Sequence, residues 1–169
     1  MISSLLIKQS KPKFFINSHV NKNNISDYKI GILKSEWNSN ITDLLLNSAR
    51  SHLLEEGVKK NNIDIKVVPG SMELVTASNI LYENDKNIDG IIALGCIIKG
   101  DTDHDKYISN AVSNGLLNVS IKFNKPVIFG VLTTNSLSQA LDRCGGKKGN
   151  KGEEAAYSLL KMLALKASL

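Results

Sequence analysis

Short apolar runs alternate with longer amphipathic stretches along most of the chain. Runs rich in aliphatic and β-branched residues have the length of buried strands, and they cover residues 29–34, 63–68, 88–94 and 126–132. Apolar residues that recur every three or four positions predict helices, which lie between Ser39 and Gly57 and over residues 71–83, 104–123, 136–143 and 153–167. Strands that alternate with helices indicate right-handed crossovers and a parallel sheet, so the pattern predicts an α/β fold.

Side chains that could contact a ligand follow each predicted strand at the point where the strand ends. In strand order these side chains are Trp37, then Met72 and Glu73, then His104, then Thr133 and Thr134. The carboxyl ends of parallel strands meet at one edge of a sheet, where ligands of open α/β folds bind. We therefore expect a binding site at this edge, and we interpret the lone tryptophan as part of it.

The stretch from Gly95 to His104 carries most of the chemistry at this edge. Its glycine-bearing turn leads into a helix, and the free N–H groups at a helix N-terminus attract phosphate. Asp101 and Asp103 oppose an anion there, so a basic side chain from elsewhere is needed. The alternative is a turn without function, in which Thr102 or Asp103 caps the helix.

Composition narrows the class of protein. With 169 residues, 42% of them hydrophobic, the chain fits one domain, and no apolar run approaches the roughly 20 residues that span a bilayer. The net charge of +5 comes mainly from lysines in the first 22 residues, so the body of the chain offers little to nucleic acid. Neither Cys96 nor Cys144 belongs to a CxxC pair or a disulfide framework, so we expect a reducing compartment. The few histidines argue against a metal site, and His52 on a predicted helix suits a surface or structural role.

Residues 1–27 show no regular pattern, and we interpret them as a flexible or partner-docking arm. Before Asp27 this segment contains neither acidic residues nor arginine. The lack of acids is typical of a transit peptide, whereas the lack of arginine is not. We expect a cytoplasmic protein, with organelle targeting as the open alternative.

Several segments, taken together and in order, resemble one family closely. They are Trp37-Asn38, Val68–Leu74, Ala93–His104, Pro126–Thr133 and Gly149–Ala156. Their residues and spacing are similar to those of 6,7-dimethyl-8-ribityllumazine synthase, from about Lys29 to the C-terminus. The resemblance implies one domain over residues 28–169, a flavodoxin-like three-layer αβα sandwich with a four-stranded parallel sheet. An N-terminal edge strand shared with a neighbouring subunit is left open.

The resemblance also implies a transferase of riboflavin biosynthesis that uses neither a metal nor a cofactor. Members of this family condense 5-amino-6-(ribitylamino)uracil with 3,4-dihydroxy-2-butanone 4-phosphate to 6,7-dimethyl-8-ribityllumazine, and they release phosphate and water. The reaction forms an imine, eliminates phosphate and closes a ring. Its proton transfers near neutral pH suit a histidine. The alternatives are a flavin- or lumazine-binding paralogue and a shell-forming paralogue with little catalysis.

By position, the resemblance assigns most of the site to the turns after the first three strands. Trp37 would stack on the pyrimidine ring, Ile97 and Ile98 would frame that ring, and His104 would transfer protons. The backbone around Ser71 and Met72, with the Glu73 carboxylate, would hold the ribityl hydroxyls. The turn formed by Gly100, Asp101 and Thr102 would receive the phosphate.

Three further residues are assigned to the adjoining subunit. Phe129 would pack against the ring, Arg143 would hold the phosphate with its planar fork, and Lys151 would reach the pyrimidine. The resemblance therefore implies a homo-oligomer whose unit is a pentamer. The short glycine-rich connection over residues 145–152 favours a shell of twelve pentamers. Riboflavin synthase is a candidate partner besides the small-molecule substrates, and neither nucleic acid nor membrane is expected.

Some positions depart from the common pattern of the family. Met72 stands where an aromatic residue is common, and Lys99 stands where arginine is usual. Asp105 and Lys106 replace an aromatic–acid pair, and we expect Lys106 to offset the charge of Asp103 and Asp105. None of these changes removes a catalytic group, so we expect an active enzyme with altered substrate affinity.

Overall fold

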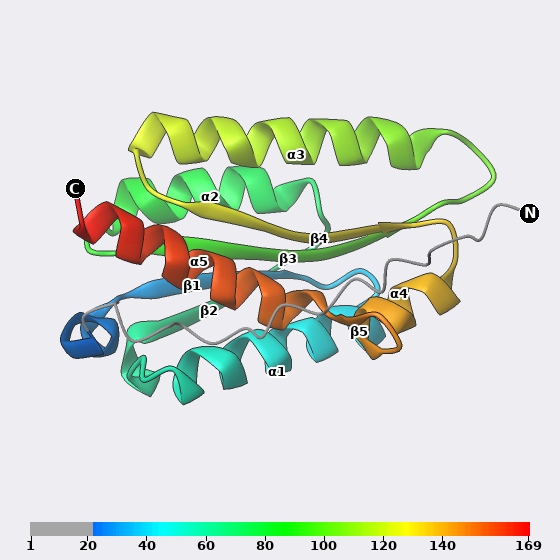
Figure 1. Ribbon diagram of the computed structural model, residues 1–169. Helices are drawn as coiled ribbons and strands as arrows, with labels where there is room; N and C mark the ends of the chain where they lie inside the picture. Colours follow the sequence, from blue (N-terminus) through cyan, green and yellow to red (C-terminus); the bar gives the residue numbers. More distant parts are fainter. Residues whose placement is uncertain (1–21) are drawn as a thin grey trace, which may run out of the picture.

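A parallel four-stranded sheet in the order β2–β1–β3–β4 forms the middle layer of the protein (Figure 1). The computed structural model describes residues 22–169. Its main strands are β1 (Ile30–Ser35), β2 (Ile63–Val68), β3 (Gly90–Ile98) and β4 (Val127–Thr134). All neighbouring pairs in this sheet are parallel, which confirms the prediction from the alternation of strands and helices.

Helices cover both faces of the sheet, so the fold is a flavodoxin-like three-layer sandwich (Figure 1). One face carries α1 (Ser39–Glu55), α4 (Leu137–Arg143) and α5 (Lys151–Ala167). The other face carries α2 (Glu73–Asn84) and α3 (His104–Phe123). Two short 3-10 helices, η1 (Lys22–Asp27) and η2 (Lys60–Asn62), precede β1 and β2. No helix in the described part of the chain is long and apolar enough to cross a membrane.

The sheet separates two hydrophobic cores, because successive side chains of a strand point to opposite faces. In β3, Ile92 and Leu94 pack with α1 and α5, whereas Ile91 and Ala93 pack with α2 and α3. β3 is buried along almost its whole length, as a strand between two others should be. The carboxyl end of β3 therefore reaches the surface from the buried centre of the sheet.

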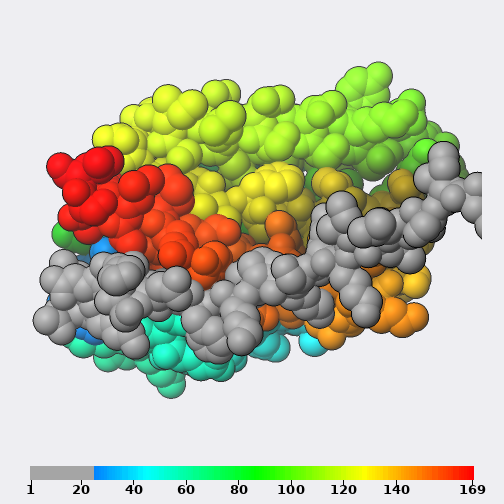
Figure 2. Space-filling view, viewed as in Figure 1, coloured from blue at the N-terminus to red at the C-terminus, as the bar shows by residue number. Residues whose placement is uncertain are grey.

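The edge strands are less buried than the central ones. Among the described residues no strand pairs with the outer edge of β2, where Val67 is exposed. The opposite edge strand, β4, reaches the surface between α3 and α5 in the space-filling view (Figure 2). Residues 1–21 of the predicted arm, and any strand that they add, lie outside the residues that the structure describes. The rest of the arm forms η1, and Ile25 of η1 is buried in the core beneath α1 and α5.

β3 is longer than the sequence pattern predicted. The apolar run indicated an end at Leu94 and placed Gly95 in a turn, but this prediction was wrong. The ladder with β4 continues from Gly95 opposite Val131 to Ile98 opposite Thr134. Pairing therefore sets the end of β3, and the turn before α3 contains only residues 99–103.

Two helix boundaries also differ from prediction, whereas α1 begins at Ser39 as expected, with Asn38 as its N-cap. α2 begins later than predicted, at Glu73, because the preceding turn closes against β3. α5 begins earlier, at Lys151, because the side chain of Asn150 accepts a hydrogen bond from the Gly152 amide and caps the helix.

The glycine-rich connection contains a short antiparallel hairpin that the pattern did not predict. Its strands are β5 (Cys144–Gly146) and β6 (Gly149–Asn150). Gly145 and Gly149 have φ angles of 127° and 87°, a region that glycine enters without steric strain. The tight connection between α4 and α5 therefore depends on these two glycines.

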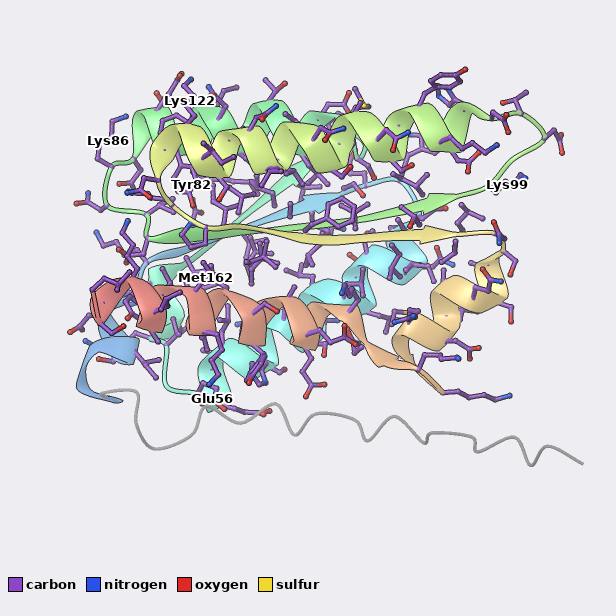
Figure 3. All side chains as sticks on the ribbon, turned by 45° about the horizontal axis from the view of Figure 1, so that its top comes forward. Glu56, Tyr82, Lys86, Lys99, Lys122 and Met162 are labelled. Atoms are coloured by element: carbon purple, nitrogen blue, oxygen red, sulfur yellow. The ribbon has the colours of Figure 1, made fainter. Side chains whose placement is uncertain are left out.

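One end of the sheet is covered by side-chain contacts, and the other end is open to solvent. Figure 3 shows Lys99 just beyond β3, and Tyr82 and Lys122 at the far end of the molecule. At that far end the Tyr82 hydroxyl donates to the Pro126 carbonyl at 2.8 Å, and Lys122 pairs with Glu83 at 3.0 Å. The far end is thus closed by its own contacts, whereas the carboxyl end opens into a cleft.

Candidate functional site

A cleft of about 530 Å³ lies where β1, β2 and β3 end and where α2 and α3 begin. Its walls come from three turns and from the first turns of two helices. The lining residues are Trp37, Asn38, Gly70, Ser71, Met72, Glu73, Cys96, Ile97, Ile98, Gly100, Thr102, His104, Asp105 and Ile108. Ligand-binding at this edge is the behaviour expected of a doubly wound α/β sheet.

The turn after β1 carries Trp37 to the mouth of the cleft, where the residue is 74% exposed. Backbone bonds hold this turn to the end of β2, because the Glu36 and Trp37 amides donate to the carbonyls of Val68 and Pro69 at 2.8 and 3.1 Å. An exposed indole in a fixed turn provides a flat apolar surface for a ring. Trp37 therefore lines the cleft at the predicted edge of the sheet, and its role in binding stays a prediction.

The turn after β2 brings Ser71, Met72 and Glu73 against the end of β3. Ser71 is buried over Gly95, where a Cβ atom would lie 2.7 Å from the Ser71 hydroxyl oxygen. Gly95 is therefore required for the close approach of this turn to β3. The Glu73 carboxylate lies over Gly70 in the first turn of α2, a position that the helix dipole favours.

The turn after β3 completes the cleft and places His104 at the first position of α3. The Thr102 hydroxyl accepts a hydrogen bond from the His104 amide at 3.4 Å, and the His104 residue is exposed. Lys106 pairs with Asp103 at 3.0 Å, so the expected offset of the Asp103 charge is present. Gly100 has open space around the position of a Cβ atom, which leaves its backbone accessible.

The acidic and basic side chains that line this cleft are Glu73, His104 and Asp105. Among the described residues that line it, none is lysine or arginine. Burial raises the pKa of the Cys96 thiol from its ordinary value of 9.0 to about 11, and nearby Cys144 adds to this effect. The thiol therefore stays protonated at neutral pH and is a poor nucleophile. The chemistry available is proton transfer at His104 beside carboxylates and polar backbone groups.

Four residues that the resemblance assigned to the site do not line the described cleft. Asp101 lies between two lining residues but faces solvent. Phe129 lies in β4 opposite Ala93, and Arg143 is exposed at the end of α4. Lys151 begins α5 and pairs with Glu154 at 3.2 Å. The turns after β1, β2 and β3 thus form one group, and the residues of β4, α4 and α5 form another.

The cleft also contains residues that the sequence did not assign to it. Asn38, Gly70, Cys96, Asp105 and Ile108 line it as well. Ile108 lies one helical turn after His104, so the helical period alone could have indicated it. Asn38 follows Trp37 directly, but its importance depends on a contact with a distant carbonyl that no sequence pattern marks.

Comparison with known proteins gives a consistent result. A family model described as 6,7-dimethyl-8-ribityllumazine synthase matches residues 27–167. Proteins of that name from Cytophaga hutchinsonii, Bacteroides fragilis and Porphyromonas gingivalis are similar to this chain, at 51%, 48% and 48% identity. The aligned residues cover 83%, 80% and 82% of this chain and 88%, 94% and 86% of the respective relatives.

Proposed function

The chain belongs to the 6,7-dimethyl-8-ribityllumazine synthase family, and we propose that two neighbouring subunits share its active site. The protein is a transferase of riboflavin biosynthesis. It condenses 5-amino-6-(ribitylamino)uracil with 3,4-dihydroxy-2-butanone 4-phosphate to 6,7-dimethyl-8-ribityllumazine, with release of phosphate and water. A lumazine-binding paralogue without catalysis is not favoured, because the similar proteins are synthases and the cleft contains a histidine.

The described cleft supplies the half of the site that binds the pyrimidine and transfers protons. Trp37 stacks on the ring at the mouth of the cleft, and Ile97 and Ile98 frame that ring. The backbone around Ser71 and Met72, together with the Glu73 carboxylate, binds the ribityl hydroxyls. Holding the amine near the incoming ketone converts a bimolecular encounter into a reaction within one complex.

His104 transfers the protons of the condensation. Attack of the amine on the ketone forms a carbinolamine, whose loss of water to the imine needs a proton on the departing oxygen. The later loss of phosphate needs a proton taken from carbon. Histidine can do both near neutral pH, because it changes charge there. His104 is exposed at the cleft edge, beside the turn that receives the phosphate.

The phosphate needs positive charge that this half of the site lacks, and this observation carries the proposal of a shared site. Glu73 and Asp105 add negative charge, and no lysine or arginine lines the described cleft. Arg143 is exposed outside the cleft, so it is free to bind a phosphate in a neighbouring subunit's cleft. Its planar fork can bind two phosphate oxygens at once. Phe129 and Lys151 reach the same cleft from that subunit.

A ring of subunits accounts for this arrangement with a single type of contact. We propose a pentamer, in which each subunit gives one half-site to one neighbour and receives the other half from the next. Exposed Leu117 and Ile121 lie one turn apart on α3 and support an apolar contact between subunits. The short β5–β6 hairpin supports further assembly into a shell of twelve pentamers, with riboflavin synthase as the partner that uses the product.

Formation of the lumazine from the two substrates tests the function, and a mixing experiment tests the shared site. His104→Ala and Arg143→Ala each damage one half of every site. When equal amounts are refolded together, about one quarter of the sites should have both halves intact. Activity that rises well above both parents supports the shared site. A mixture no more active than its parents places His104 and Arg143 in the same subunit's site.

A further inference from the structure

Asn38 has an unusual backbone conformation at the edge of the cleft. Its φ and ψ angles are 59° and 44°, in the left-handed region that residues other than glycine seldom occupy. This conformation ends the turn after β1 and begins α1, because the Asn38 carbonyl accepts hydrogen bonds from the Ile41 and Thr42 amides at 2.8 and 3.0 Å. Asparagine tolerates the left-handed region better than most residues.

The same residue connects this turn to β3. The Asn38 side-chain amide donates to the Cys96 carbonyl at 2.9 Å. Cys96 lies in the last part of β3, immediately before Ile97 and Ile98 of the cleft wall. The two backbone bonds of Glu36 and Trp37 hold the turn only to the end of β2. The Asn38 amide therefore fixes the distance between the Trp37 turn and the β3 wall.

We propose that Asn38 is a positioning residue, which holds the indole of Trp37 opposite the Ile97–Ile98 wall so that the pyrimidine fits between them. The proposal rests on the proposed function. Trp37 is 74% exposed, so its own packing contributes little to its placement. Its direction depends on the turn that carries it. Because a hydrogen bond already sets the gap between Trp37 and β3, a planar ring can enter it without the cost of ordering the turn on binding.

The position makes two demands that substitutions can separate. Its residue must adopt the left-handed conformation, and it must donate a hydrogen bond to a carbonyl. In Asn38→Gly the first demand is met and the second is not. In Asn38→Asp the shape is kept, but a carboxylate faces the Cys96 carbonyl and repels it. We expect both variants to fold and the aspartate variant to show the larger effect.

The chain offers a matched control at the opposite end of the sheet. Asn124, the C-cap of α3, is the other residue besides glycine with positive φ in the described part of the chain, at 50°. Asn124→Gly repeats the same backbone change far from the cleft. If Asn38→Gly shows an effect that Asn124→Gly does not, the cause is the loss of the Asn38 side-chain amide and not the change of backbone.

The first measurement is independent of activity. Trp37 is the single tryptophan of the sequence, so its time-resolved fluorescence anisotropy reports only on this turn. We expect the fast local motion of the indole to have about twice its wild-type amplitude in Asn38→Gly, because the turn loses a constraint. Asn124→Gly should behave as the wild type. Equal amplitudes in Asn38→Gly, Asn38→Asp and wild type would overturn the proposal.

The second measurement separates binding from chemistry. We expect Asn38→Gly to raise KM for the pyrimidine about fivefold to tenfold, the effect of one lost hydrogen bond, with kcat changed less than about twofold. KM for the butanone phosphate should stay unchanged, since that group binds elsewhere. Unchanged KM for the pyrimidine, or an equal rise in Asn124→Gly, contradicts the positioning role. A wild-type protein that forms no lumazine refutes the proposed function instead, while the anisotropy measurement still decides the role of Asn38.

Discussion

His104 stands where the turn after β3 becomes α3, with its side chain at the cleft. We expect His104→Ala to lower kcat by about 10²- to 10⁴-fold, the range for loss of a general acid–base group. Some activity should remain, because the residues that orient the substrates are untouched. Steady-state kinetics over a range of pH measure the effect, and light scattering shows whether assembly is preserved. An unchanged kcat at every pH would remove His104 from the mechanism.

Cys96 links the site to the pH dependence of stability. Because burial raises the pKa of its thiol from 9.0 to about 11, the folded protein holds this proton after the unfolded chain has lost it. The stabilisation is therefore complete below about pH 9 and is lost as the pH rises to about 11. From about pH 9 to 11, we therefore expect the free energy of unfolding of the wild type to fall by about 2 kcal/mol more than that of Cys96→Ala.

Urea titrations of both proteins at intervals across this pH range provide the measurement. Burial also raises the pKa values of Tyr28, Tyr82 and Cys144. The free energy of unfolding of the variant should therefore still fall somewhat as the pH rises. Parallel curves for Cys96→Ala and wild type would show that the Cys96 proton is not held by folding.

At the scale of single residues, the sequence revealed side chains but not the bonds that position them. Trp37, Glu73 and His104 were predicted at the sheet edge because each follows a recognisable strand, and all three line the cleft. The role of Asn38 was not predictable, since its partner is the main-chain carbonyl of Cys96. A carbonyl is present at every position, so it leaves no signature in a sequence.

Gly152 fixes how closely α5 packs on α1. A Cβ atom there would clash with the main chain at Leu45. We expect Gly152→Ala to lower the free energy of unfolding by about 2 kcal/mol or more, although alanine is the better helix former. Urea denaturation measures this change.

Gly100→Ala is the matched control for that experiment, because no atom lies within 4 Å of the position of its Cβ. Its free energy of unfolding should stay within about 0.5 kcal/mol of the wild-type value. Equal stability of Gly152→Ala and Gly100→Ala would mean that α5 shifts to accept the methyl group.

At the scale of elements, local pattern predicted the order of strands and helices, and tertiary pairing decided their ends. Gly95 resembles a turn residue, yet β3 runs through it because β4 continues alongside to Thr134. The β5–β6 hairpin was missed for the opposite reason, since Gly145 and Gly149 mark a turn but not its pairing. Pairing partners distant in sequence are invisible to a window of neighbouring residues.

The β5–β6 hairpin allows a test at the scale of the whole assembly. We expect wild-type protein at assay concentration to scatter light as a particle much larger than a pentamer. A short insertion between Lys147 and Lys148, at the exposed tip of the hairpin, should leave pentamers that retain activity. A wild-type particle of pentamer size refutes the shell, and an active monomer refutes the shared site.

In the proposed pentamer, one chain supplies only one half of each active site. The sequence grouped Phe129, Arg143 and Lys151 apart from the first three strands, and the described cleft lacks all three. Which surface of a second copy they would meet in the proposed pentamer was not predictable, because exposed apolar residues such as Leu117 carry no mark of a partner. Arg143→Ala, with Arg143→Lys as a partial rescue, would connect this second group to the phosphate through KM for the butanone phosphate.

The lining of the cleft draws on both hydrophobic cores. Cys96 packs with the core beneath α1 and α5, and Ile97 packs with the core beneath α2 and α3. A ligand seated on both residues is therefore thermodynamically linked to the folding of the entire domain. At a hundredfold excess over its Kd, such a ligand adds about 2.7 kcal/mol to the free energy of unfolding. A variant weakened in either core should melt at a higher temperature once the pyrimidine is added, so the substrate acts as a chaperone for its own enzyme.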